Sequence, residues 1–206
     1  MQFLKLAEKL PKFFSTKDVQ FITASRPESA RVLCARYTKD GIFLRIQRDL
    51  YCFKKVFDHL NRADYFHLSG QIQKNTYLSF STALAYYGIL PSLPHLTEAV
   101  SFIRSTEKQV GKQTWKYHKL PKKLFFDYKK IESAKDHDFI LASPEKALLD
   151  TLYLYSLGRY YVDLKKINLE RIDFERLVEQ AEKFPDRTKK LLKNLYGRGK
   201  RTNPRN

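Results

Sequence analysis

Four arginines between residues 31 and 48 are spaced so that they could bind phosphate groups. Arg31 and Arg36 fall on the flanks of a predicted helix, and Arg45 and Arg48 follow in a predicted hairpin. Arginine presents five donors in a planar fork that matches phosphate oxygens. Small and medium side chains stand between the flanking arginines and could touch base edges while the arginines hold the backbone. The pattern predicts an interface for duplex DNA.

The full set of candidate DNA-binding residues occupies the solvent side of that helix and the hairpin after it. The set is Arg26, Glu28, Ser29, Arg31, Val32, Ala35, Arg36, Lys39, Arg45 and Arg48. The other side of the helix carries Ala30, Leu33, Cys34 and Tyr37 at i, i+3, i+4 and i+7, which is the spacing of a buried stripe. The alternative is a helical protein–protein module whose charged flanks are simply solvated.

The elements that must position these side chains have local signals of their own. Ser15 and Asp18 are spaced as a capping box, which predicts a helix over 16–23. A tight turn follows, and Pro27 suits the first position of a second helix, over 27–39.

Two predicted strands, over 42–46 and 50–53, form a short wing after this pair of helices. Helices are also predicted over 1–13 and 54–63. We therefore expect residues 1–70 to form a winged helix-turn-helix domain.

Residues 71–196 are expected to form a second domain of mixed α and β structure, so the fold class is α+β. The polar stretch 64–75 predicts the boundary. Ser143, Pro144 and Glu145 form a strong helix start, for a helix reaching about residue 157. The remaining predicted elements are a helix ending at Gly88, strands over 99–104, 114–120, 124–127 and 139–142, and helices in the last third of the chain.

The C-terminal end is strongly basic. A secondary basic surface with non-specific affinity for nucleic acid is predicted from Lys189, Lys190, Lys193, Arg198, Lys200 and Arg201. Residues 197–206 have no apolar side chain and are expected to be a disordered basic tail.

The whole composition fits a polyanionic partner. The 206 residues carry a net charge of +17 and a pI near 9.8. No apolar run approaches the roughly 20 residues that span a bilayer, and the N-terminus lacks a signal-peptide core. We expect a cytoplasmic protein with no membrane partner, in which Cys34 and Cys52 are small buried hydrophobes rather than a disulfide.

Sequence motifs for catalysis are missing. There is no glycine-rich phosphate loop, no nucleophile elbow and no zinc signature. The run Asp136-His137-Asp138 could bind a metal, but a solvated turn is the favoured interpretation. Glu145 and Asp150 lie five residues apart on one helix and do not share a face. We expect no metal, no cofactor, no catalytic residues and no enzymatic activity.

Two segments carry a resemblance to a known family. Residues 142–150, Ala-Ser-Pro-Glu-Lys-Ala-Leu-Leu-Asp, closely resemble a signature of AbiEi-type antitoxins from type IV toxin–antitoxin systems. Tyr77 to Leu84 with Tyr87 and Gly88 is similar to a second motif of that family, and 168–173 looks like its late helix start. The similarity covers roughly residues 10–195.

The resemblance implies a prokaryotic repressor that binds operator inverted repeats upstream of its own operon. It also implies antitoxin activity of the second domain against a nucleotidyltransferase-like toxin, without a stable complex between the two proteins. The helix after Ser143 then serves as a core scaffold, with Ala147, Leu148, Thr151 and Leu152 facing inward.

This sequence departs from the family pattern at Asp49, where the wing turn usually carries glycine. Asp tolerates a left-handed turn, but its charge beside Arg48 is expected to weaken phosphate contact. The alternative function is a structural or regulatory RNA-binding protein that uses the same basic surface. A DNA-processing nuclease would need an acidic metal cluster that the sequence does not offer.

Overall fold

The computed structural model describes residues 2–93, 95–133 and 137–202, and the side chains of 6–93, 95–133 and 137–197. The chain divides into two compact units, Met1–Arg62 and Ala63–Asn206. Both are built from helices and strands, which confirms a mixed α+β protein. The boundary predicted after residue 70 falls inside a helix, α5 (Arg62–Ile72), so the predicted polar linker is wrong. Across the described residues, no helix has the length and apolar character needed to cross a bilayer.

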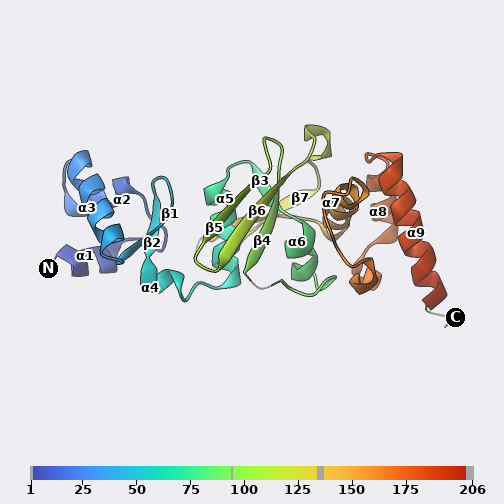
Figure 1. Cartoon of the computed structure of the whole chain (residues 1–206), viewed down its shortest axis with the longest axis horizontal. Coiled ribbons are helices and arrows are strands. Elements are labelled where there is room, and N and C mark those ends of the chain that lie inside the picture. Colours follow the sequence, from blue (N-terminus) through green and yellow to red (C-terminus); the bar gives the residue numbers. More distant parts are fainter. Residues whose placement is uncertain (1, 94, 134–136, 203–206) are drawn as a thin grey trace. The chain divides into compact units, whose positions relative to one another are not determined.

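Among its described residues, the first unit has four helices and a two-stranded sheet (Figure 1). In order these are α1 (Gln2–Lys9), α2 (Thr16–Thr23), α3 (Pro27–Lys39), β1 (Phe43–Gln47), β2 (Leu50–Phe53) and α4 (Lys54–Phe57). The bounds of α2 and α3 are those predicted. The helix predicted over 54–63 is much shorter, because tight i→i−3 hydrogen bonds at His59 and Leu60 replace the helical ladder after Phe57.

The core of the first unit ties the small sheet to the helices. Phe14 exchanges two backbone hydrogen bonds with Tyr51 of β2, at 2.9 and 2.8 Å. Its ring packs edge-on against Phe43 of β1, whose ring in turn meets Tyr37 of α3. The buried set is Leu6, Phe14, Val19, Ala30, Leu33, Cys34, Tyr37, Phe43 and Tyr51.

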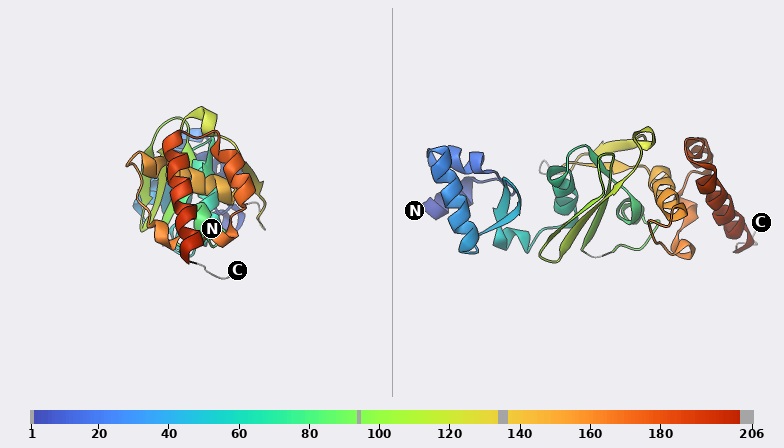
Figure 2. Two further views of the ribbon diagram at one scale, coloured as in Figure 1. Left: turned by 90° about the vertical axis from the view of Figure 1, so that its right-hand side faces the viewer. Right: turned by 45° about the horizontal axis from the view of Figure 1, so that its top comes forward.

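The second unit is organised around a six-stranded mixed sheet (Figure 2). The strand order is β5-β6-β4-β3-β8-β7. Two neighbouring pairs, β4 with β6 and β3 with β8, are parallel and the rest are antiparallel. The strands are β3 (Thr76–Leu78), β4 (Leu96–Ser101), β5 (Thr106–Val110), β6 (Gln113–Lys119), β7 (Tyr128–Ile131) and β8 (Phe139–Ala142).

Helices cover both faces of this sheet. Trp115 and Tyr117 of β6 hydrogen-bond carbonyls of α5, at Tyr65 and Ser69. His118 points to the opposite face, where it meets the ring of Phe80 at the start of α6 (Phe80–Tyr86). The C-terminal layer is α7 (Pro144–Ser156), α8 (Phe174–Ala181) and α9 (Asp186–Thr202), with short 3₁₀ turns at Lys122–Leu124, Leu164–Lys166 and Leu169–Arg171.

The strand predicted over 124–127 is wrong. Leu124 ends a 3₁₀ turn, and Asp127 has a left-handed φ of +51° that no regular strand accepts. The strand that does form is β7, the next segment of the chain. It was not predicted because it is an exposed edge strand with two lysines and lacks an apolar alternation. The strands β3 and β5 were also not predicted, because β3 is very short and β5 is polar.

The C-terminal end is helical further than expected. The backbone of α9 continues to Thr202, so the disordered tail predicted from residue 197 is wrong for its first six residues. Residues 203–206 lie outside the described part of the chain.

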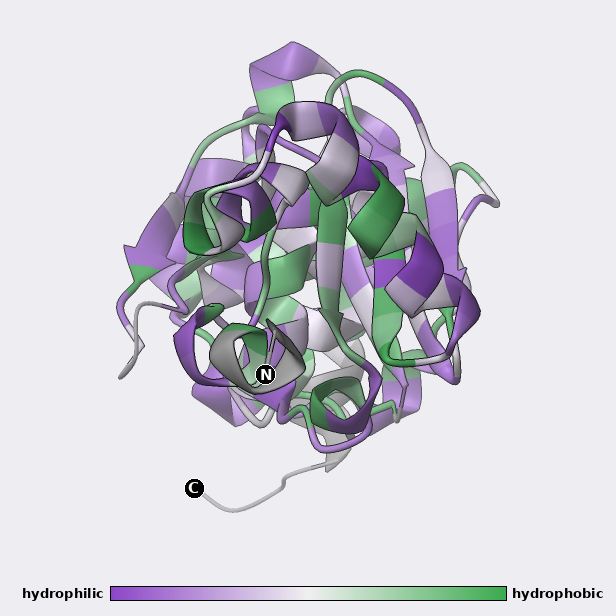
Figure 3. Ribbon diagram, turned by 90° about the vertical axis from the view of Figure 1, so that its left-hand side faces the viewer, coloured by the Kyte–Doolittle hydropathy of each residue, from purple (hydrophilic) through white to green (hydrophobic). Residues whose placement is uncertain are grey.

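Hydrophilic and hydrophobic stretches alternate along many elements in Figure 3, as expected for helices and strands buried on one side.

Candidate nucleic-acid interface

Helix α3 has one buried side and one exposed side. Ala30, Leu33, Cys34 and Tyr37 are buried, which confirms the predicted inner stripe. The exposed side defines the α3 face, composed of Glu28, Ser29, Arg31, Val32, Ala35, Arg36 and Lys39. All ten candidate DNA-binding residues are exposed and lie in the first unit, while their contact with DNA stays a prediction.

The turn before α3 is held by local backbone and side-chain bonds. The capping box is present, with the Ser15 N–H donating to the Asp18 carboxylate and the Asp18 N–H donating to the Ser15 hydroxyl. Ala24 ends α2 with a left-handed φ of +50°. Arg26 occupies the N-cap of α3 with its side chain making no cap bond, and Pro27 follows at the first turn. The orientation of α3 is thus set by residues outside its exposed face.

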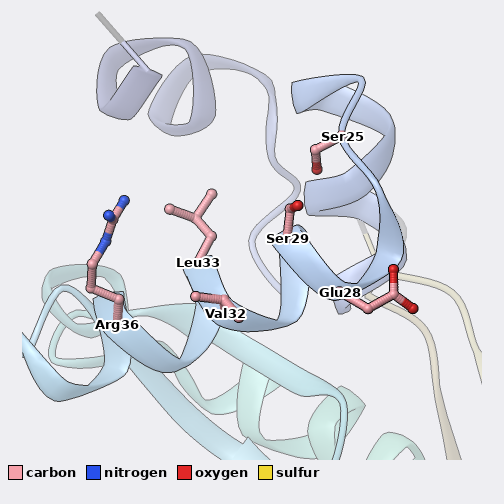
Figure 4. Close-up of a pocket in the computed structure, with 6 residues that line it drawn as sticks. All are labelled: Ser25, Glu28, Ser29, Val32, Leu33 and Arg36. Carbon is pink, nitrogen blue, oxygen red and sulfur yellow. The ribbon is translucent and has the colours of Figure 1, made fainter.

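A hollow of about 370 Å³ runs beside α3 (Figure 4). Ser29, Leu33 and Arg36 project to the same side of the helix in this view. The lining residues are Ser25, Glu28, Ser29, Val32, Leu33 and Arg36. The guanidinium of Arg36 lies 5.5 Å from the ring centre of Tyr37, which is within the range of a cation–π interaction. Polar donors and an acceptor therefore surround a small apolar surface.

The two-stranded sheet presents Arg45 and Arg48 to solvent. Arg45 is exposed on β1, and its Nε donates to the Gln47 carbonyl at 3.3 Å. Arg48 stands in the two-residue turn between Gln47 and Leu50, which pair across the strands. Among the described residues, neither arginine forms an ion pair with a carboxylate. Both side chains are therefore available to bind an anion.

Asp49 plays a different part from the one expected. Its φ is +57°, so the tolerance of Asp for a left-handed turn is confirmed. Its carboxylate accepts hydrogen bonds from the N–H and the hydroxyl of Thr16, at 2.8 and 2.6 Å. The negative charge is therefore directed at the positive N-terminal end of α2, and this bonding joins the turn of the sheet to that helix.

The secondary basic surface is only partly available. Lys189 forms ion pairs with Glu182 at 2.7 Å and with Asp186 at 3.8 Å, so its predicted free positive charge is largely neutralised. The hydrogen bond to Glu182 raises the pKa of the Lys189 ammonium. Lys190 and Lys193 are exposed on α9. Arg198, Lys200 and Arg201 lie on the same helix, but their side chains are outside the described set.

The second unit contains a buried ion pair that was not predicted from the sequence. Lys146 and Asp150, one turn apart in α7, are fully buried and hydrogen-bonded to each other. Tyr77 and Ser79 also donate to Asp150, at 3.0 and 2.9 Å. Burial lowers the pKa of Lys146 and raises that of Asp150. Their i,i+4 spacing was the available signal.

A second buried carboxylate belongs to Glu98 of β4. It accepts hydrogen bonds from Ser81, from Tyr160 at 2.6 Å and from His118 at 2.9 Å. Burial alone would raise the pKa of Glu98, but these hydrogen bonds outweigh it and the net pKa is lowered. The carboxylate is enclosed and fully bonded, so this cluster stabilises the sheet rather than offering an open reaction centre.

The Asp127 carboxylate links the start of α7 to α8. It accepts hydrogen bonds from Ser143 at the start of α7, and from Arg176 and Gln180 of α8, the last at 2.6 Å. A hollow of about 390 Å³ lies beside it. Burial alone would raise the pKa of Asp127, but these three hydrogen bonds outweigh it. The net pKa lies below the ordinary value, and the carboxylate is held in its charged form.

The run at His137 is not the solvated turn that was favoured. His137 Nδ1 lies 2.6 Å from the buried Asp64 carboxylate, and the His137 ring is only slightly exposed. Asp136 lies outside the described residues. Within the described part of the chain, no three potential ligands gather in a geometry that could hold a metal ion.

The buried side of α7 agrees with a scaffold. Ala147, Leu148, Thr151 and Leu152 are fully buried, as predicted. Ser143 caps the helix by accepting from the Lys146 N–H.

Comparison of the sequence with protein-family models gives no match, and no curated protein matches it either.

Proposed function

We propose that this protein is a sequence-specific DNA-binding repressor that uses the first unit as a winged helix-turn-helix. The observation that carries the proposal is the two-sided character of α3. One side packs into the core, whereas the α3 face is fully exposed and combines arginines with small and apolar side chains. That composition suits the floor and walls of a major groove.

The hairpin adds a second contact region to the proposal. Arg45 and Arg48 are exposed on the two-stranded sheet, where a wing would approach phosphates or the minor groove. The net charge of +17 supports attraction to a polyanion over long range. Repression then follows because a bound protein blocks its own promoter.

The same proposal includes an antitoxin role in the cytoplasm. It rests on the resemblance of residues 142–150 and 77–88 to AbiEi-type antitoxins, in which the second unit opposes a nucleotidyltransferase-like toxin. Burial of the α7 signature favours a scaffolding role for these residues over direct contact with a partner.

A reporter assay tests the repression. The DNA upstream of the gene drives a reporter, and the wild-type chain is expected to lower its output. The double variant Arg31→Ala/Arg36→Ala should restore the output at equal protein level, and Arg159→Ala, an exposed arginine of the second unit, should not. Equal output with and without the wild-type chain would refute repression.

Co-expression tests the antitoxin role. The product of a neighbouring gene, if it is a nucleotidyltransferase that arrests growth, should be harmless when this chain is present. Growth arrest that persists at high levels of this chain would rule out antitoxin activity while leaving repression in place.

The second candidate is RNA binding through the same basic surface. This candidate is disfavoured because the α3 face is a helix surface, and the major groove of A-form RNA is too narrow for side chains to read. Structured RNA that displaces the chain from its upstream DNA at equal concentration would favour this candidate.

A further inference from the structure

Val32 is an apolar side chain placed where folding does not require one. It is 67% exposed at the middle of the α3 face. Valine forms helices less readily than alanine, so the residue stabilises neither the helix nor the core. Its stiff β-branched side chain has one preferred rotamer in a helix, which presents its methyl groups in a fixed direction.

The neighbours of Val32 limit what can approach it. Arg31 and Arg36 flank it on the two sides of the α3 face, and both are exposed. Glu28 lies one helical turn earlier and lines the same hollow as Val32. A carboxylate there would be repelled by phosphates, whereas the flanking guanidinium groups would attract them. The middle of the α3 face, at Glu28 and Val32, therefore suits base edges. The flanking arginines suit the phosphates of the two DNA strands.

Thymine is the base whose major-groove edge carries a methyl group. Burying one such group against an apolar side chain changes affinity by about fourfold. Uracil in the same duplex has the same hydrogen-bonding edge without the methyl group, so it isolates this contact.

We propose that Val32 is a specificity-determining residue that reads the 5-methyl group of a thymine in the operator. The inference rests on the proposed DNA-binding function and adds the chemistry of one base to it. Val32 and Leu33, the apolar part of the hollow shown in Figure 4, receive the methyl group. The exposed Arg31 and Arg36 hold the phosphates on either side.

The test uses duplexes in which single thymines are replaced by uracil. A preferred duplex is first selected from a random library with the full chain, and each thymine of that duplex is then replaced in turn. Dissociation constants are measured at one salt concentration for the wild type, for Val32→Ala, and for the control Val178→Ala. Val178 lies in α8 and is also partly exposed, at 43%.

The wild type and the control should bind about fourfold more weakly when one particular thymine of a half-site becomes uracil. Val32→Ala should bind both duplexes equally, since the methyl contact is already lost. Because Val32 is exposed and alanine favours helix, this variant is expected to keep its circular dichroism spectrum and melting temperature.

Two results would overturn the inference while leaving DNA recognition intact. One is a selected duplex in which no uracil replacement weakens binding. The other is a uracil penalty that Val32→Ala retains in full. Failure of the selection to enrich any duplex would instead refute the proposed function and this inference with it.

Discussion

The carboxylate of Asp49 accepts hydrogen bonds from both the backbone N–H and the hydroxyl of Thr16, at 2.8 and 2.6 Å. These residues are far apart in sequence, one in the turn of the β1–β2 hairpin and the other at the start of α2. The bond pair satisfies a helix N-terminal donor and fixes the hairpin relative to the helix that precedes α3. The geometry of the candidate interface thus depends on a residue outside the α3 face.

Replacement of Asp49 should loosen this connection. Asp49→Ala should destabilise the first unit by about 1 to 2 kcal/mol, because the donors of Thr16 lose their acceptor and alanine tolerates a positive φ less well. Asp49→Gly should cost less, since glycine accepts the +57° φ without strain. Hydrogen exchange of the α2 amides measures both, and a larger loss for glycine than for alanine would contradict this account.

Much of the first unit could be predicted because its signals are local. The capping box at Ser15 and the proline at residue 27 mark the ends of α2 and α3, and the apolar spacing of Ala30 to Tyr37 marks the buried side. The exposed side follows by elimination. The bond from Asp49 to Thr16 could not be predicted, because it joins residues that only the fold brings together.

The second unit was less accessible to prediction. Its central strand β3 has three residues, and its edge strands β5 and β7 are rich in charge, so neither periodicity nor hydropathy marks them. The partner of Asp150 is Lys146, one helical turn away, and the sequence does not show that both side chains are buried. An i,i+4 pair of this kind is usually on a helix surface, but here both side chains are fully buried.

That core pair should be sensitive to the loss of one partner. Lys146→Met should destabilise the second unit by about 3 to 5 kcal/mol, because it leaves the Asp150 charge buried and uncompensated. The double variant Lys146→Met/Asp150→Asn should cost less than the sum of the single changes. Urea unfolding followed by the fluorescence of Trp115, the single and fully buried tryptophan, measures this.

The exposed Lys166 provides a control for this series. Lys166→Met should change the free energy of unfolding by less than about 0.5 kcal/mol. Additive effects of the two changes at 146 and 150 would argue against a coupled pair.

The Glu98 cluster should make the stability of the second unit pH-dependent. The pKa of the Glu98 carboxyl in the folded protein lies below the ordinary value of 4.5. The contribution of Glu98 to the free energy of unfolding is therefore complete above pH 4.5. As the pH falls through 4.5 toward the folded-state pKa, the unfolded chain binds the proton first and the contribution is lost.

Comparison with Glu98→Gln isolates this effect. The difference in urea midpoint between the wild type and this variant should shrink as the pH falls from about 4.5 to 3. Tryptophan fluorescence again reports the transition. A difference that grows as the pH falls would mean that the hydrogen bonds to Glu98 do not favour its charged form.

The two cysteines should be unreactive in the folded protein. Burial, together with the Asp49 charge, raises the pKa of the Cys34 thiol to about 11, and burial with Asp58 raises that of Cys52 to about 12. Iodoacetamide at pH 8 should therefore label neither thiol in the native state and both in urea, as judged by mass spectrometry. Rapid labelling of the native protein would show that the first unit opens readily.

The flanking arginines of α3 should govern the salt dependence of DNA binding. Arg31→Ala or Arg36→Ala should reduce the slope of log affinity against log salt by about 0.9, which corresponds to one phosphate contact. Arg159→Ala should leave the slope unchanged. Slopes equal to the wild type in both α3 variants would exclude phosphate contact by this helix.

The most direct test of the central proposal is a ratio of two dissociation constants. The full chain is titrated, at physiological salt, onto the duplex from upstream of its own gene and onto a shuffled duplex of the same length and composition. A repressor that reads sequence through the α3 face should bind its own duplex at least about a thousandfold more tightly. Equal binding of the two duplexes would contradict the proposal.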